Sequence, residues 1–190
     1  QKSFFNTDNI LLASARAGNV IGGGDWAIDR LVPDMVKAAS NNNEVFIRSP
    51  YATRPWQHVL EPLSGYLNLG WKLLKGEKTF ADGWNFGPDQ DNNISVLDLT
   101  KNSKVLWNKI NYTVDKNLAN HHEANLLMLD CSKANKILKW KPVWDIKQTL
   151  EKTIGWYKSF YQNSIINTDN DLQEYIQSAK DKSLLWTGSI

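Results

Sequence analysis

Two arginines and a histidine lie close together in residues 48–58, which read RSPYATRPWQH. The planar guanidinium groups of Arg48 and Arg54 can each hold two oxygens of a phosphate, and the aromatic side chains beside them can stack on a nucleotide base. These residue types favour a site for a nucleotide diphosphate, although a surface loop with scattered cations would have the same composition. His58 alternates with an apolar residue, as in a strand, which fits either a buried, hydrogen-bonded histidine or a catalytic one.

A second polar segment, residues 16–26, reads RAGNVIGGGDW and contains four glycines within seven positions. Such a density of glycine predicts a loop, because regular structure is disfavoured there. Glycine also lets the backbone approach a ligand, but the spacing is neither that of a Walker loop nor that of a Rossmann turn. A sharp connection between a strand and a helix is therefore the favoured interpretation. Asn19 could donate a hydrogen bond to a phosphate or stabilise the turn.

The remaining reactive residues form no catalytic set that we recognise. His121 and Glu123 could share one face of a strand, but no third ligand is spaced for a metal ion, and we predict none. Cys131 is the single cysteine, so no internal disulfide can form and a cytoplasmic location is expected. We recognise neither a nucleophilic serine elbow nor a Tyr-x-x-x-Lys pair of the kind that nicotinamide-dependent short-chain enzymes use. These residues alone predict an α/β lobe that binds a nucleotide or another anion.

Short elements must position these residues. Apolar runs predict strands at residues 10–15, 45–47, 56–60 and 81–86. Helical periodicity and capping patterns predict helices at residues 29–39 and 62–76, after Ser95, and after Asp145. The elements lack the long regular alternation of a complete doubly wound sheet. We therefore predict one α/β lobe over residues 1–162 and a tail with a short helix over residues 163–190.

The composition is typical of a folded protein that does not bind polyanions or lipid. Apolar residues make up 42% of the 190 residues and charged residues 22%, which allows a substantial core. The net charge is only +2, and no lysine- or arginine-rich run is present. No apolar stretch is long enough to span a bilayer. We expect neither a nucleic-acid partner nor a membrane partner.

Several segments resemble, in the same order, blocks of the extended short-chain dehydrogenase/reductase family. RAGNVIG at residues 16–22 is similar to the R-x-x-N-x-x-G stretch after the sixth strand of these enzymes. RPWQHV at residues 54–59 and WNFG at residues 84–87 resemble two blocks of the nucleotide-sugar dehydratases and epimerases. Longer runs, such as RPWQHVLEPLSGYL, resemble the branch of CDP-glucose 4,6-dehydratases, and the likeness extends over residues 3–160.

The resemblance implies the C-terminal part of a Rossmann-type extended short-chain dehydrogenase, with a small mixed α/β substrate-binding lobe. In this branch, bound NAD takes a hydride from C4 of the glucosyl unit, water leaves across C5 and C6, and the hydride returns to C6. The NAD turn, a Tyr–Lys pair and an acidic pair would belong to a half preceding Gln1. The resemblance therefore implies no catalytic residue within this chain, and a homo-oligomer for the whole protein.

Transferred residue by residue, the resemblance implies NAD contacts at Arg16 and Ala17. It implies contacts with CDP-glucose or a related sugar nucleotide at Asn19, Arg30, Leu31, Arg48, Arg54 and His122. Among these, Asn19 and Arg54 would hold the diphosphate, and Arg48 would lie against the base. Two alternatives stay open: another nucleotide-sugar dehydratase or epimerase, and a non-catalytic nucleotide-binding fragment.

Overall fold

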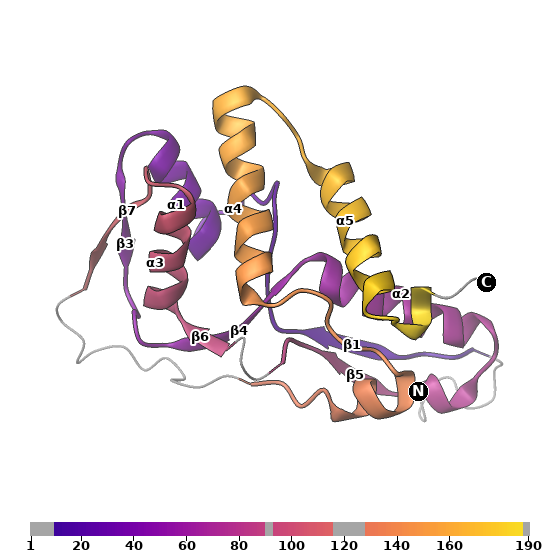
Figure 1. Cartoon of the computed structure of the whole chain (residues 1–190). Helices are drawn as coiled ribbons and strands as arrows, with labels where there is room; N and C mark the ends of the chain where they lie inside the picture. The colour runs from indigo at the N-terminus through magenta and orange to yellow at the C-terminus, as the bar shows by residue number, and fades with distance from the viewer. Residues whose placement is uncertain (1–9, 90–92, 116–127, 188–190) are drawn as a thin grey trace.

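Short strands in three small sheets form the frame of the computed structural model, which describes residues 10–89, 93–115 and 128–187 (Figure 1). The sheets are β1 (Ser14–Ala17) with β5 (Gly83–Phe86); β2 (Asn19–Ile21) with β4 (Thr53–His58) and β6 (Asn93–Ser95); and β3 (Glu44–Ile47) with β7 (Asn111–Val114). Three of the four pairings are parallel, and only β4 with β6 is antiparallel. The predicted α/β class is therefore confirmed.

In the described part of the chain, α-helices connect and cover these strands: α1 (Leu31–Ser40), α2 (Leu60–Leu74), α3 (Val96–Leu106), α4 (Ile146–Asn163) and α5 (Thr168–Asp181). The capping predictions are confirmed. The Ser95 hydroxyl accepts a hydrogen bond from the Asp98 amide at 3.0 Å and begins α3. Asp145 and Gln148 form a reciprocal capping box at the start of α4. Each cap satisfies amide groups that would otherwise lack a partner, so the sequence itself specifies where these helices begin.

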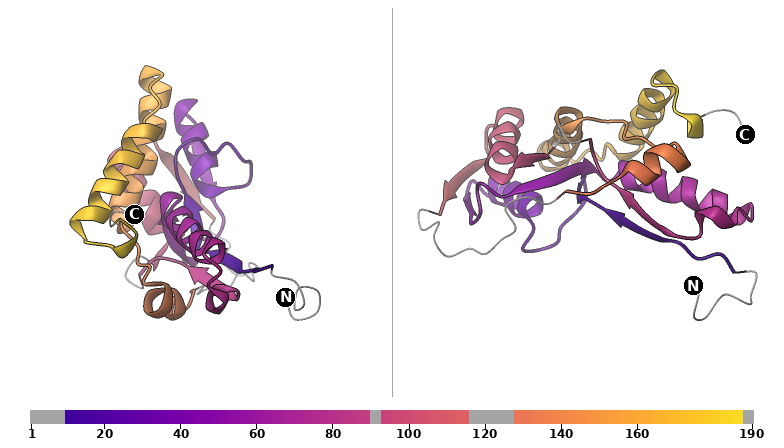
Figure 2. Two further views of the ribbon diagram at one scale, coloured as in Figure 1. Left: turned by 90° about the vertical axis from the view of Figure 1, so that its right-hand side faces the viewer. Right: turned by 90° about the horizontal axis from the view of Figure 1, so that it is seen from below.

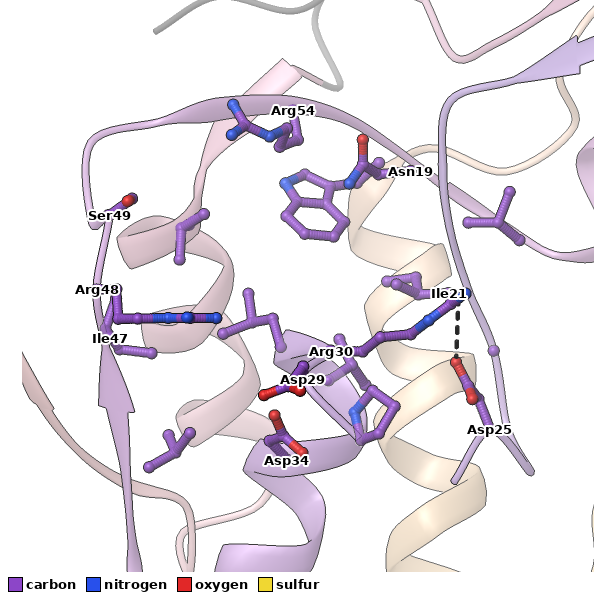
Figure 3. A pocket seen from close by; sticks show the side chains of 18 of the residues that line it. Asn19, Ile21, Asp25, Asp29, Arg30, Asp34, Ile47, Arg48, Ser49 and Arg54 are labelled. Atoms are coloured by element: carbon purple, nitrogen blue, oxygen red, sulfur yellow. Dashed lines mark ion pairs between the residues drawn. The ribbon is translucent and has the colours of Figure 1, made fainter. Parts of the chain in front are cut away.

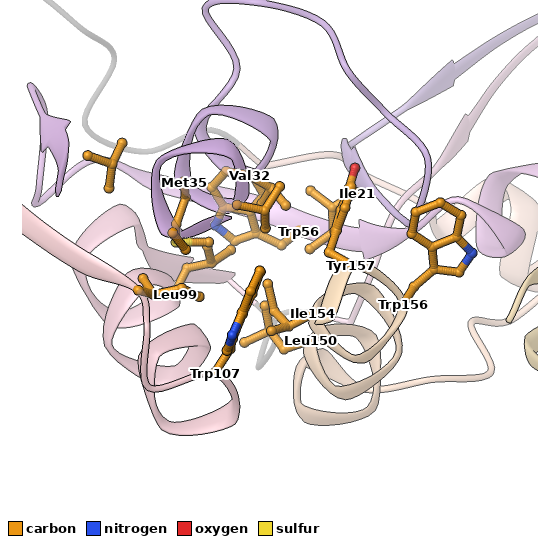
Figure 4. Packing of buried hydrophobic residues seen from close by; sticks show 14 of the residues in the cluster. Ile21, Val32, Met35, Trp56, Leu99, Trp107, Leu150, Ile154, Trp156 and Tyr157 are labelled. Atoms are coloured by element: carbon orange, nitrogen blue, oxygen red, sulfur yellow. The ribbon is translucent and has the colours of Figure 1, made fainter. Parts of the chain in front are cut away.

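The largest core cluster lies where α1, α3 and α4 meet the sheet that contains β2 and β4 (Figure 4). Met35 of α1, Leu99 of α3 and Ile154 of α4 are all fully buried in it. Trp56 of β4 also packs there, and its indole donates to the Ile94 carbonyl at 3.2 Å. This cluster holds β2 and β4, with the polar residues that they carry, in a fixed position.

Two smaller clusters stabilise the opposite end of the molecule. One contains Leu69 of α2, Phe86 of β5 and the buried Trp140. The other contains Trp144 and Tyr175, and Tyr175 joins α5 to the rest of the chain. Figure 2 shows α5 lying beside the other helices rather than extending away from them.

The carboxylate of Glu61 is completely buried at the junction of these elements. It accepts hydrogen bonds from the Val143 amide at 2.9 Å, the Trp144 amide at 2.7 Å and the Tyr175 hydroxyl at 2.9 Å. Burial raises the pKa of Glu61 to about 7, and these hydrogen bonds only partly oppose the shift. One side chain of α2 thus ties the entry to α4 and the middle of α5 together.

The first strand prediction was wrong in its bounds and its burial. The apolar run at residues 10–15 predicted a buried strand that ended before Arg16, whereas β1 includes Arg16 and is largely exposed. Within the described residues β1 pairs only with β5, so its apolar side chains are not enclosed. The predicted loop also contains β2. Gly18 makes this possible, because a Cβ there would lie 2.5 Å from the Pro55 carbonyl oxygen.

Within the described ranges, no helix combines the length and apolar character needed to cross a lipid bilayer.

Candidate functional site

A cavity of about 560 Å³ lies between β2, β3, β4 and the start of α1 (Figure 3). Its volume is in the range of sites that bind small molecules and cofactors. Five of the residues predicted to contact the sugar nucleotide line this one cavity: Asn19, Arg30, Leu31, Arg48 and Arg54. They come from four separate segments of the chain, and the fold brings them together.

Strand pairing places Asn19 and Arg54 at the same end of the cavity (Figure 3). Asn19 of β2 is the register partner of Trp56 in the parallel strand β4. Arg54 precedes Trp56 by two residues, so both side chains project to the same face of β4. The Arg54 guanidinium donates to the carbonyl of Thr53 at 2.9 Å. An amide and a guanidinium group thus lie at the same end of the cavity, and both can donate hydrogen bonds to an anion.

An aromatic cluster anchors the loop of residues 22–30 to α4. The Tyr157 hydroxyl accepts from the Asp25 amide at 2.9 Å and donates to the Asp25 carbonyl at 2.7 Å. Burial raises the pKa of Tyr157 to about 12, so the hydroxyl stays protonated and able to donate. Trp26 packs its ring against Trp156 and Tyr157. Because the loop carries Arg30 into the cavity, this cluster positions a residue of the site.

Gly23 shows why the loop needs its glycines. A Cβ at this position would lie 2.1 Å from the indole of Trp156, so any side chain would displace that ring. Gly24 follows with a φ of +81°, a conformation that L residues rarely adopt. The favoured interpretation of the segment, a sharp connection between a strand and a helix, therefore agrees with the structure.

Three carboxylates of the cavity did not figure among the predicted site residues. Asp25 forms an ion pair with Arg30 at 3.7 Å, and Asp29 and Asp34 also line the cavity. Asp29 has a φ of +60°, which is uncommon for a residue other than glycine. Their proximity to the arginines depends on how α1 packs against β3. In the sequence, these carboxylates were marked only by their position near the predicted start of α1.

The two predicted NAD contacts lie elsewhere, and one predicted substrate contact cannot be placed. Arg16 and Ala17 belong to β1 and are not part of the lining of this cavity. His122 lies outside the described residues, as do His121 and Glu123. Within the described ranges no group of three metal-binding side chains occurs.

Of the two interpretations of His58, a buried, hydrogen-bonded histidine or a catalytic one, the structure supports the first. Its ring accepts from the Leu60 amide at 3.3 Å and contacts the ring of Trp144 with a centroid separation of 4.9 Å. Burial, assisted by the charge of Lys152, lowers the pKa of His58 to about 4. The side chain is therefore neutral near pH 7 and supports packing rather than proton transfer.

One Tyr-x-x-x-Lys spacing does occur in the chain, at Tyr112 and Lys116. Tyr112 lies on the extended strand β7, however, and Lys116 is outside the described residues. The pair used by short-chain enzymes lies on a helix, where residues four apart share a face. Tyr112 does not meet that requirement.

Comparison with a curated protein of Salmonella typhimurium (strain LT2) bears directly on the site. The two sequences are 43% identical over an alignment of 187 residues, which covers 94% of this chain. The chain is similar to CDP-glucose 4,6-dehydratase. It spans about half of that protein, 52% of its length. The resemblance found from the sequence blocks is thereby confirmed, whereas no family model matches the chain.

Solved structures of nucleotide-sugar enzymes show the same fold. UDP-glucuronic acid 4-epimerase from Bacillus cereus, in complex with UDP-glucuronic acid and NAD, matches with a TM-score of 0.63 and 19% identity over 77% of this chain and 45% of that one. dTDP-glucose 4,6-dehydratase from Bacillus anthracis, in complex with NAD, matches with a TM-score of 0.60 and 18% identity over 82% and 47%. The chain therefore has the fold of part of a Rossmann-type extended short-chain dehydrogenase, as predicted.

Proposed function

We propose that this chain forms the sugar-nucleotide-binding part of a CDP-glucose 4,6-dehydratase, which converts CDP-glucose to CDP-4-keto-6-deoxyglucose. The observation that carries the proposal is the shared cavity of Asn19, Arg48 and Arg54. The 43% identity to a CDP-glucose 4,6-dehydratase supports the same substrate. The cytoplasmic location, and a homo-oligomeric state of the whole protein, belong to this proposal.

In the proposed complex, Arg54 and Asn19 hold the diphosphate. A guanidinium group matches phosphate oxygens with two parallel N–H donors, and the neighbouring amide adds a third. Arg30 and Leu31 border the nucleotide from the start of α1, and Arg48 faces the base from the end of β3. His122 is proposed to approach the ribose or a phosphate. These contacts orient the glucosyl unit, and orientation of the reacting carbon is a large part of catalysis in such enzymes.

NAD would supply hydride transfer when bound, taking the hydride from C4 and returning it to C6. In α/β folds dinucleotides bind at the carboxyl ends of parallel strands. The paired strands β1 and β5 provide such an edge, since Ala17 and Phe86 are register partners at their ends. Arg16 and Ala17 are the residues of this chain that we propose to lie near the nicotinamide. The remaining NAD contacts and the catalytic groups would come from residues outside this chain.

Replacing Arg54 by alanine tests the proposal. We expect CDP-glucose to bind the altered chain more weakly by about 1.5–3 kcal/mol, because a charged hydrogen-bond partner of the diphosphate is lost. Isothermal titration calorimetry measures the difference. Lys109→Ala removes an exposed cation away from the cavity and should leave the affinity unchanged. Equal affinities of the unaltered chain and Arg54→Ala for CDP-glucose would exclude the proposed role of Arg54.

The same titration separates the proposal from its nearest alternative. A different nucleotide-sugar dehydratase or epimerase would prefer UDP-glucose or dTDP-glucose over CDP-glucose. We expect the preference to be for CDP-glucose, and we expect the chain alone to bind the substrate without converting it.

A further inference from the structure

The cavity is bipolar rather than uniformly positive. Its lining contains three arginines and three aspartates. Figure 3 shows Arg54 and Asn19 at one end and the carboxylates of Asp29 and Asp34 at the other. A site that bound only a diphosphate would gain nothing from carboxylates, because they repel an anion. The carboxylate end must therefore face a part of the ligand that donates hydrogen bonds.

Several charged side chains of the cavity have no side-chain partner among the described residues. Asp25 is paired with Arg30, but neither Asp29, Asp34 nor Arg48 forms a side-chain hydrogen bond or ion pair within the structure as described. Asp34 is half-buried in the first turn of α1, while Asp29 and Arg48 are exposed to the cavity. Two acceptors and one planar donor group are thus directed at the same space, and they are available to a ligand.

The arrangement matches the hydrogen-bonding edge of cytosine. That edge presents an amine donor at N4, followed by acceptors at N3 and O2. A carboxylate accepts from the amine, and a guanidinium group donates to the two acceptors. Uracil and thymine present an acceptor at O4 and a donor at N3, so they would face the carboxylate and the guanidinium with the wrong groups. Apolar side chains of Leu31 and Ile47 line the same cavity and suit the faces of a flat base.

We propose that Asp29 and Asp34 select a cytidine nucleotide over uridine and thymidine nucleotides, with Arg48 reading the adjacent edge of the base. This inference rests on the proposed function, since it assumes that the diphosphate lies at the end with Arg54 and Asn19. It adds the groups that distinguish the base. Discrimination arises chiefly because the wrong base turns an acceptor toward a carboxylate, which leaves both groups without a hydrogen-bond donor.

The left-handed backbone of Asp29 makes a clean test available. Asparagine tolerates a positive φ as aspartate does, so Asp29→Asn should keep the loop conformation. The amide that replaces the carboxylate can donate to O4 of uracil, so the change weakens CDP binding and improves UDP binding together. Asp34→Asn makes the same exchange on α1. Asp169→Asn is the matched control, because Asp169 also lies in the first turn of a helix, α5, and is far from the cavity in sequence and in fold.

The experiment measures the dissociation constants of CDP and UDP for the 190-residue chain and these three variants by calorimetry. We expect the preference for CDP over UDP to fall by about tenfold in Asp29→Asn or Asp34→Asn, and to be unchanged in Asp169→Asn. A CDP preference that survives both cavity variants overturns the inference and leaves the proposed function intact. Failure of the unaltered chain to bind CDP would overturn both. Thermal unfolding of each variant confirms that it is folded, and either cavity variant alone suffices for the test.

Discussion

The end of the molecule that contains the cavity and the end that contains α2 differ in how completely they are covered. Around the cavity, α1, α3 and α4 cover the sheet of β2 and β4, and Met35, Leu99 and Ile154 are fully buried. On α2, by contrast, a stripe of large apolar side chains faces solvent. Leu67 is 75% exposed and Leu74 is 85% exposed.

This difference distinguishes the part of the molecule that the described residues bury on their own from the part that they leave exposed. The cavity is built on a core that the described residues complete. Among the described residues, β1 pairs only with β5 and is largely exposed, although parallel sheets are normally buried on both faces. The relative from Salmonella typhimurium is about twice as long as the matched region, so it has further residues that could cover such a surface. The cavity is therefore the better defined of the two regions.

The largest expected effect is at Glu61, which joins α2 to the segment before α4 and to α5. Replacing Glu61 by alanine leaves two buried amides and the Tyr175 hydroxyl without their acceptor. We expect the free energy of unfolding to fall by about 3–5 kcal/mol in urea titrations. Glu44→Ala, at an exposed position of β3, should change it by less than about 0.5 kcal/mol. A loss below about 1 kcal/mol for Glu61→Ala would mean that α5 does not depend on this carboxylate.

The two faces of α2 give the next largest contrast. Leu69 is 4% exposed and packs with Phe86, so Leu69→Ala should cost about 2–4 kcal/mol of unfolding free energy. Leu67→Ala, two residues earlier on the exposed stripe, should cost less than about 0.5 kcal/mol. Chemical denaturation of both variants measures the contrast. Similar losses of unfolding free energy in Leu69→Ala and Leu67→Ala would show that the exposed apolar stripe of α2 is buried in solution.

The pH dependence of stability provides a third test of the region around α2. The folded pKa of Glu61 is raised from 4.5 to about 7, so its contribution to stability falls as the pH rises through this window. The folded pKa of His58 is lowered from 6.5 to about 4, so its contribution is lost as the pH falls from 6.5 toward 4. Between pH 4.5 and 6.5 the two slopes have opposite signs and cancel.

Glu61→Gln removes the contribution of Glu61 to the pH dependence of stability. We expect its stability to rise with pH more steeply than that of the unaltered chain, by about 1.4 kcal/mol per pH unit between pH 4.5 and 6.5, because the opposing slope of Glu61 is removed while that of His58 remains. The unaltered chain should show a nearly flat profile over the same range. A flat profile for Glu61→Gln would contradict the lowered pKa of His58.

The smallest expected effect concerns the anchor of the cavity loop. Tyr157→Phe removes one hydroxyl that both donates to and accepts from Asp25. We expect a loss of about 1 kcal/mol in unfolding free energy and a weaker affinity for CDP, since the loop carries Arg30. Tyr161→Phe changes a neighbouring ring of the same cluster and serves as the control. An unchanged CDP affinity in Tyr157→Phe would show that the loop holds its position without this hydroxyl.

Local features of the fold were predictable from the sequence, and non-local ones were not. The caps at Ser95 and Asp145 depend on residues three positions apart, and both were predicted where the structure has them. The division of residues 14–21 into β1 and β2 depends on pairing with β5 and β4, which are distant in sequence. A count of glycines could not reveal that Gly18 serves this pairing.

The same distinction holds for the site. Asn19 and Arg54 belong to sequence blocks that could be matched, and the structure places them in one cavity with Arg48. Asp29 and Asp34 are the first and last residues of the run DRLVPD, which also resembles the family, but the match predicted no role for their carboxylates. Their importance becomes visible only when the packing of α1 against β3 brings them opposite Arg48.

The anchoring of residues 22–30 also bears on the thermodynamics of ligand capture. The aromatic rings around Trp26 and the close contact between Gly23 and Trp156 leave this stretch of backbone few alternative conformations even in the empty protein. Little disorder then remains to be removed when a nucleotide enters, and the entropic penalty on that side of the complex is small. Association should accordingly proceed with little rearrangement, close to a lock-and-key process.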